Sequence, residues 1–309
     1  MTPVTHPFRF GVLTKGAPTR AAWHDLLARV EGGGFDALHV PLHTTPQFAP
    51  FVALADAAAR TTLRLATLVH NNDLQHPALL ARDATTLALL SDGRFELGVG
   101  AGWMERDYRQ LGIPMDPGRL RVDRLAEAVE ILRGCWAEGP YTFHGKHYTV
   151  TDLQGLDGPR VPLLVGAGGD RMLRLAARIA DIVSFSRSIS AGAAPRQIAE
   201  DASLESTERK AAVVRAHLGD RAADVELHIL VVKAGVGDDA RRQLDEHVVA
   251  TGVSATTARQ TPEHLLGRDA QELADLLRER RERTGINYHV FRDVHLDVVR
   301  PVVEQLAGR

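Results

Sequence analysis

The feature that most constrains this chain is a repeated alternation between short β-rich segments and longer segments with helical periodicity. In the longer segments apolar residues recur every three or four positions, and in the shorter ones branched and aromatic residues predominate. The expected strands are residues 8–13, 35–40, 63–69, 94–99, 163–165, 181–185, 225–232 and 286–291. Since at least one expected helix follows each of these strands, the sequence predicts eight consecutive βα units.

Residues at the ends of the expected helices favour helix termini. Thr19 can cap a helix at 20–31, the glycines at 32–34 can end it, and Pro77 suits the first turn of a helix at 78–90. An alternating segment at 140–152 that turns at Gly145 predicts a surface hairpin. The other expected helices are residues 48–60, 120–136, 170–179, 204–218, 238–250, 270–284 and 295–306.

Strict βα alternation predicts parallel strands joined by right-handed crossovers. Eight unbroken repeats favour an α/β fold of the (β/α)8 TIM-barrel type, and 309 residues exceed the about 250 that such a barrel needs, which leaves room for insertions. We therefore expect one domain over residues 1–309. An open, doubly wound sheet of eight strands is the alternative.

Charge and composition exclude several classes of protein. The 37 basic and 39 acidic residues give a net charge of -2, so we expect no nucleic-acid partner and no anionic membrane partner. The single cysteine, Cys135, permits no intrachain disulfide and no cysteine-based zinc site. The first nine residues lack the apolar run of a signal peptide, and no apolar run approaches the about 18 residues of a membrane span, so we expect a cytoplasmic protein.

In a parallel barrel, function gathers in the loops that follow the strands. His43 comes after the second expected strand, where an imidazole can bind a cofactor or move a proton near neutral pH; an ordinary polar loop histidine is the alternative. His39 and His43 could suggest a metal pair, but clustered carboxylates and a His-x-His sequence on the first strand are lacking, so we expect no metal site.

Glycines mark the ends of the two middle strands. Gly98, Gly100 and Gly102 follow one another at alternate positions, which would let a flat ligand approach the backbone. A dinucleotide-binding glycine motif is the rival, but it normally follows the first strand and opens a helix directly, whereas here the polar loop 104–117 intervenes. Before them, His70 and Asn71 lie at the end of the third strand, where a polar turn is the alternative.

After the fifth expected strand, Gly166, Gly168 and Gly169 lead directly into a helix, with Arg171 in its first turn. Bare amides at a helix N-terminus bind anions, and Arg171 can add a charge. We therefore expect a phosphate site, with a tight βα turn as the alternative. Together the strand ends predict an aromatic, phosphorylated cofactor.

The same segments carry a family resemblance. Residues 94–103 and 107–114 are similar to the strand-four signature of the luciferase-like flavin and deazaflavin oxidoreductases, and residues 76–82 and 163–169 with Ala180-Asp181 resemble two further family segments. The pattern is most similar to the branch that uses the deazaflavin coenzyme F420. This resemblance implies reversible hydride transfer at the deazaflavin C5, a small-molecule substrate and a homodimer. Residues 77–90 and 132–136 could form the dimer interface, although core burial explains the same residues.

The resemblance also implies roles for single residues. His43 matches a histidine beside the ring and the substrate, which predicts a catalytic proton donor or acceptor. A non-prolyl cis peptide is expected at Thr67–Leu68, behind the central ring. The residues expected to contact the cofactor are Leu13, Thr67, Leu68, His70, Asn71, Gly100, Ala101, Gly102, Trp103, Gly166, Gly168, Gly169 and Arg171.

Two departures weigh against the reaction of the sugar-phosphate dehydrogenases in this family. Trp103 stands where those members have a catalytic Glu, and Leu42 stands where they have an Asp. Trp103 is expected to pack on cofactor or substrate, with an ordinary core aromatic as the alternative.

Three other functions stay open at this point. An FMN-dependent monooxygenase would need a separate flavin reductase. A non-catalytic flavin-binding barrel would have its substrate cavity filled by loops 104–117 and 186–198. A metal-dependent barrel hydrolase would need metal ligands, whose spacing the sequence lacks.

Overall fold

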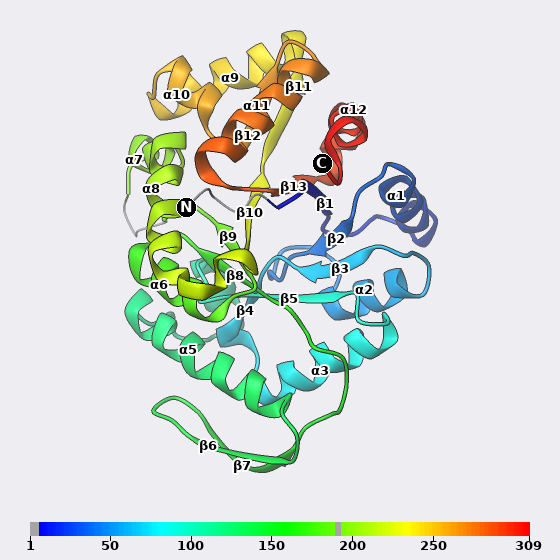
Figure 1. Cartoon of the computed structure of the whole chain (residues 1–309), viewed down its shortest axis with the longest axis vertical. Helices are drawn as coiled ribbons and strands as arrows, with labels where there is room; N and C mark the ends of the chain where they lie inside the picture. The colour runs from blue at the N-terminus through cyan, green and yellow to red at the C-terminus, as the bar shows by residue number, and fades with distance from the viewer. Residues whose placement is uncertain (1–5, 189–192) are drawn as a thin grey trace. The chain divides into compact units, whose positions relative to one another are not determined.

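A computed structural model describes residues 6–188 and 193–309 (Figure 1). The chain forms two compact units. The first unit comprises Met1–Thr14, Ala28–Ala37 and Ala167–Arg309, and the second unit comprises Lys15–Leu27 and Leu38–Gly166. The expectation of a single domain over residues 1–309 stays a prediction.

The second unit holds the middle strands of the chain. Strands β3 (Arg64–Thr67), β4 (His70–Asn71) and β8 (Leu163–Ala167) all pair in parallel with β5 (Phe95–Gly100), and β2 (Ala37–Val40) lies next to β3. Every residue of β5 is buried, as expected for a parallel strand covered on both faces. Its other elements are α2 (Pro50–Ala58), η1 (Asn72–Leu74), α3 (Pro77–Leu90), α4 (Glu105–Leu111), α5 (Gly118–Cys135), β6 (Pro140–His144) and β7 (Thr149–Gln154).

Several local predictions are confirmed in this unit. Thr19 caps α1 (Arg20–Gly32) by accepting a hydrogen bond from the amide of Ala22 at 3.1 Å. Pro77 begins α3, and β6 and β7 form the expected antiparallel hairpin, which Figure 1 shows beside α5.

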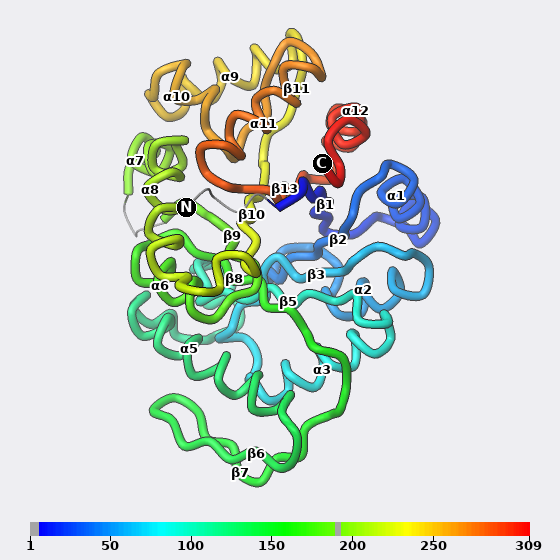
Figure 2. Tube along the Cα trace, in the orientation of Figure 1, coloured from blue at the N-terminus to red at the C-terminus, as the bar shows by residue number. Residues whose placement is uncertain are grey.

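The first unit contains four parallel strands in the order β1 (Arg9–Leu13), β13 (Tyr288–Arg292), β10 (Glu226–Val231) and β9 (Ile182–Phe185). Between β10 and β13 the chain adds a second, two-stranded parallel sheet of β11 (Lys233–Val236) and β12 (His264–Gly267), which Figure 2 shows as part of the yellow-to-orange trace. The helices of this unit are α6 (Asp170–Ile179), α7 (Pro195–Asp201), α8 (Leu204–Leu218), α9 (Gly237–Thr251), α10 (Ala255–Gln260), α11 (Ala270–Thr284) and α12 (Leu296–Leu306), with η2 (Gly219–Ala223) and η3 (Asp293–His295).

All eight expected strands are present, but three expectations need correction. The third strand is divided into β3 and β4, and β11, β12 and α10 were not predicted. The expected loop 104–117 contains α4. In the expected loop 186–198, residues 195–198 belong to α7. Residues 189–192 of this segment lie outside the described part of the chain. In the described residues, no helix has the length and apolar character that a membrane crossing requires.

Candidate active site

The glycines at the end of β5 make room for other parts of the protein. A Cβ on Gly98 would collide with the carbonyl of Thr67, and one on Gly100 would lie 2.9 Å from Cγ2 of Val69. Gly102 has a φ of +77°, and a Cβ there would collide with the hydroxyl of Tyr108. On the side where a Cβ would point, protein atoms therefore occupy the space expected for a flat ligand. The contribution of Gly100 and Gly102 to cofactor binding stays a prediction.

The predicted cis peptide is present one residue later than expected. It joins Leu68 to Val69, so the assignment to Thr67–Leu68 was wrong. Thr67, the last residue of β3, binds the backbone of β5 through its side chain: its hydroxyl donates to the carbonyl of Gly98 at 2.8 Å and accepts from the amide of Gly98 at 2.9 Å. The amide of Leu68 also donates to the carbonyl of Val40 at 3.1 Å.

His43 forms a pair with a carboxylate that the sequence analysis did not select. It follows β2, and its Nδ1 lies 2.7 Å from Oδ2 of Asp107 in α4. The Asp107 side chain is 2% exposed, whereas that of His43 is 19% exposed. The other Asp107 oxygen accepts from the amide of Thr44 at 3.1 Å and from its hydroxyl at 2.8 Å. Asp107 thus orients the imidazole from within the protein.

The environment of Asp107 determines its charge. Burial alone would raise the pKa of this carboxyl group, but hydrogen bonds from His43 and Thr44 outweigh burial, and the pKa lies below its usual value of 3.8. Asp107 is therefore ionised at neutral pH and accepts a hydrogen bond from the Nδ1–H group of His43. This arrangement leaves Nε2 as the ring atom that can exchange a proton with a bound molecule.

Trp103 lies beside the pair of His43 and Asp107. Its ring centroid is 5.8 Å from that of His43, and the two ring planes meet at 86°, edge to face. The side chain is 51% exposed. The alternative interpretation of Trp103 as a core aromatic is therefore wrong.

A polar network supports the loop that carries Trp103. The hydroxyl of Tyr108 contacts Asn71 Oδ1 at 3.3 Å and Asp73 Oδ2 at 2.9 Å, and Arg124 forms an ion pair with Asp73 at 3.0 Å. Arg121 donates to the carbonyl of Gly102 at 3.0 Å. Burial raises the pKa of Tyr108, which keeps its hydroxyl protonated. Asn71, predicted as a cofactor contact, thus has a buried side chain that faces Gly102 and Tyr108.

His70 lies in a different environment from Asn71, its neighbour in β4. Its ring is buried at a centroid distance of 6.1 Å from Phe51, in α2. In the described part of the chain, neither ring nitrogen has a hydrogen-bonding partner. Burial lowers the pKa of His70 to about 4, so the ring is neutral at pH 7. Its predicted contact with a cofactor stays a prediction.

The other predicted cofactor contacts are divided between the units. In the second unit, Ala101 is half-buried, and a Cβ on Gly166 would make only ordinary contact with Val69, at 3.7 Å. In the first unit, Leu13 is half-buried at the end of β1.

The predicted phosphate site lies at the start of α6, in the first unit. A Cβ on Gly168 would lie 2.9 Å from the carbonyls of Ser186 and Arg187, so close backbone packing accounts for this glycine. Gly169, the N-cap, is exposed and open: the atom nearest to a Cβ there is Ser188 Oγ at 3.8 Å. Arg171 is exposed in the first turn of α6.

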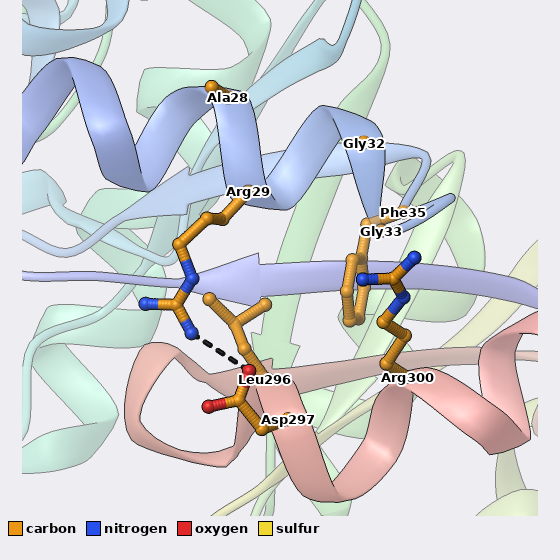
Figure 3. A pocket seen from close by; sticks show the side chains of 8 residues that line it. All are labelled: Ala28, Arg29, Gly32, Gly33, Phe35, Leu296, Asp297 and Arg300. Atoms are coloured by element: carbon orange, nitrogen blue, oxygen red, sulfur yellow. Dashed lines mark hydrogen bonds and ion pairs between the residues drawn. The ribbon is translucent and has the colours of Figure 1, made fainter.

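A separate pocket in the first unit involves none of the predicted residues (Figure 3). Two of the charged side chains that line it, Arg29 and Asp297, form an ion pair at 2.9 Å. Its lining is Ala28, Arg29, Gly32, Gly33, Phe35, Leu296, Asp297 and Arg300. We assign it no catalytic role. Among the residues with described positions, no group of three or more His, Cys, Asp or Glu side chains is placed to hold a metal ion.

Comparison with known families gives a match over most of the chain. A model described as luciferase-like monooxygenase matches residues 4–287. An F420-dependent glucose-6-phosphate dehydrogenase of Beutenbergia cavernae is 34% identical over 182 residues, which is 54% of this chain and 54% of the relative. The chain therefore spans about half the length of that curated relative.

Solved structures establish the fold. An F420-dependent secondary alcohol dehydrogenase, in complex with an F420–acetone adduct, aligns with a TM-score of 0.77 at 20% identity, over 97% of this chain and 99% of the other. The EDTA monooxygenase of Chelativorans sp. BNC1 aligns with a TM-score of 0.74 at 15% identity, over 97% and 94%. The predicted luciferase-like (β/α)8 TIM barrel is thereby confirmed. At these identities the likeness concerns the fold alone.

Proposed function

Because the chain belongs to the luciferase-like monooxygenase family, whose members are flavin- or F420-dependent oxidoreductases, we propose that it is an F420-dependent oxidoreductase. The proposed reaction is hydride transfer between the deazaflavin and a carbon atom of a small organic molecule that carries a hydroxyl or carbonyl group. The observation that carries this proposal is the pair of His43 and Asp107, because a catalyst of this reaction must move a proton as well as a hydride.

When bound, the deazaflavin would supply or accept the hydride at its C5. The protein supplies the proton step. In the oxidative direction, an alcohol substrate gives up its hydroxyl proton as well as a hydride. The hydroxyl proton passes to Nε2 of His43, and a carbonyl group forms. Asp107 stabilises the resulting imidazolium through Nδ1, and the reverse direction uses the same groups in reverse order.

In each unit, the predicted contact residues suit one part of a planar, phosphorylated cofactor. In the second unit, the segment between β3 and β4 and the loop from Gly100 to Gly102 would hold the ring, with further predicted contacts at Thr67 and Asn71. Gly169 at the start of α6 is open at its Cβ position, and amides at a helix start suit a phosphate group. Gly166 in the second unit, and Leu13, Gly168 and Arg171 in the first, stay predicted cofactor contacts.

The similarity to an F420-dependent glucose-6-phosphate dehydrogenase supports F420 over FMN as the cofactor. The likeness to the EDTA monooxygenase concerns the fold and does not choose a cofactor. A binding-only barrel would not need a buried carboxylate to orient an exposed imidazole, so this pair weighs against the non-catalytic alternative.

Cofactor titration tests the proposal. Purified protein is titrated with F420 and with FMN, in oxidised and reduced forms, and binding is followed by cofactor fluorescence. We expect saturable binding of F420 and at least tenfold weaker binding of FMN. Saturable binding of FMN, with oxygen consumption when reduced FMN is supplied, would replace this proposal with the monooxygenase alternative.

A further inference from the structure

A large apolar side chain lies exposed next to the proposed proton-transfer group. Trp103 is 51% exposed, and its indole contacts the imidazole of His43 edge to face. Covering an aromatic side chain removes a large apolar surface from water, so a molecule bound at His43 would gain free energy by packing against the indole. The surface that a substrate meets next to His43 is therefore aromatic.

The charged residues around this pair are engaged or directed elsewhere. Asp107 is buried, and His43 and Thr44 already donate to its two oxygens. Arg121 donates to the carbonyl of Gly102, and Arg124 pairs with Asp73 and Asp116. These groups hold the loop and are not offered to a ligand.

The two arginines of α4 lie away from the face that carries Asp107. At 100° per residue, Arg106 and Arg109 are rotated by about 100° and about 160° from Asp107 around the helix. Gln110, about 60° away, shares the face of Asp107 and contacts the hydroxyl of Thr44. Glu105, the remaining charged residue of α4, is also rotated by about 160° from Asp107. Apart from the buried Asp107, the face of α4 toward His43 thus carries no charged side chain.

We propose that the substrate carries its reacting hydroxyl or carbonyl group on an uncharged, largely apolar skeleton, and that Trp103 determines this specificity by packing against the skeleton. This inference rests on the proposed function for the reaction itself. The reacting oxygen lies at Nε2 of His43, and the carbon framework lies on the indole. A phosphorylated sugar would place a dianion beside an indole that cannot pair with it.

Steady-state kinetics with F420 compares 1-phenylethanol and cyclohexanol with glucose 6-phosphate. We expect kcat/KM for the two apolar alcohols to exceed that for glucose 6-phosphate by at least a hundredfold. In Trp103→Ala, KM for the apolar alcohols rises about tenfold while the Kd of F420 stays within twofold, and Trp103→Phe recovers most of the loss. Equal or higher kcat/KM for glucose 6-phosphate in the wild-type enzyme would overturn the inference.

A binding experiment without cofactor separates this inference from the proposed function. Acetophenone quenches indole fluorescence, and the chain has three tryptophans, Trp23, Trp103 and Trp136. We expect saturable quenching in the wild type, its loss in Trp103→Phe, and its retention in the matched control Trp136→Phe. Quenching that persists in Trp103→Phe would overturn the inference, whatever the cofactor titration gives. Failure of F420 to bind, with normal acetophenone quenching, would contradict the proposed cofactor alone.

Discussion

Two histidines of the second unit follow neighbouring strands, and they have opposite environments. His43 is partly exposed, has an ionised carboxylate at 2.7 Å and lies edge to face with an exposed indole. His70 is buried against Phe51, and neither of its nitrogens has a partner in the described part of the chain. The comparison teaches that a position at a strand end does not decide the chemistry of a histidine. The face of the strand or loop from which it projects decides it.

Removal of the His43 imidazole tests the comparison most strongly. His43→Ala should lower kcat by about a thousandfold, because general acid–base groups contribute roughly 10² to 10⁴ in rate. The measurement is kcat at saturating alcohol and F420, with the Kd of F420 as the control. His70→Phe should keep kcat within about threefold, and an equal loss in both variants would mean that the two histidines are not functionally distinct.

Replacement of Asp107, the carboxylate partner of His43, should have the second-largest effect on kcat. Asp107→Asn should lower kcat by about a hundredfold, since the protonated imidazole loses the anion that stabilises it. The measurement is kcat together with the free energy of unfolding, and a fall in kcat that is matched by a loss of folded protein would indicate that Asp107 only maintains the fold.

The buried histidine should affect stability. Because burial lowers the pKa of His70 from 6.5 to about 4, the unfolded chain binds more protons than the folded chain between these two values. The free energy of unfolding therefore falls as the pH is lowered through this window, and this residue should account for about 2 kcal/mol between pH 7 and pH 5.

Denaturant unfolding at the two pH values measures this contribution. His70→Phe should lose about 2 kcal/mol less than the wild type on acidification. His264 and His289, whose pKa values burial lowers to about 3, are present in both proteins and cancel in the difference. Identical pH dependence in both proteins would show that His70 has access to water in solution.

The smallest effect is expected from the second donor to Asp107. Thr44→Val removes the hydroxyl at 2.8 Å but leaves the backbone amide at 3.1 Å, so kcat should fall by only about threefold to tenfold. A loss as large as that of Asp107→Asn would place the hydroxyl of Thr44, and not the pair alone, at the centre of the site.

The strands were predictable because each is a local run of apolar residues, such as the fully buried segment Phe95–Gly100. The role of Asp107 was not predictable, since it depends on contact with His43, a residue 64 positions away in the sequence. Residues 107–114 were noted only as part of a family signature, and the segment that forms α4 was expected to be a loop. His70 and Asn71 were both assigned to the cofactor, although adjacent strand residues project to opposite faces.

For the glycines at and after the end of β5, the sequence predicted a close contact but not the contacting atoms. Their alternate spacing correctly indicated close approach to the β5 backbone, but it could not tell a ligand from a protein neighbour. The neighbours are the carbonyl of Thr67, the side chain of Val69 and the hydroxyl of Tyr108. Which atoms fill a space opened by a missing Cβ is set by tertiary packing and not by local sequence.

Two consecutive residues of α4 point in different directions, and this limits how the enzyme can be redesigned. Asp107 is tied to the segment after β2, and Tyr108 is tied to the segment after β4. One turn of α4 therefore links the segment after β2 to the segment after β4. Changes of substrate range should be accessible through the exposed indole, whereas insertions within Glu105–Leu111 would disturb both loops at once.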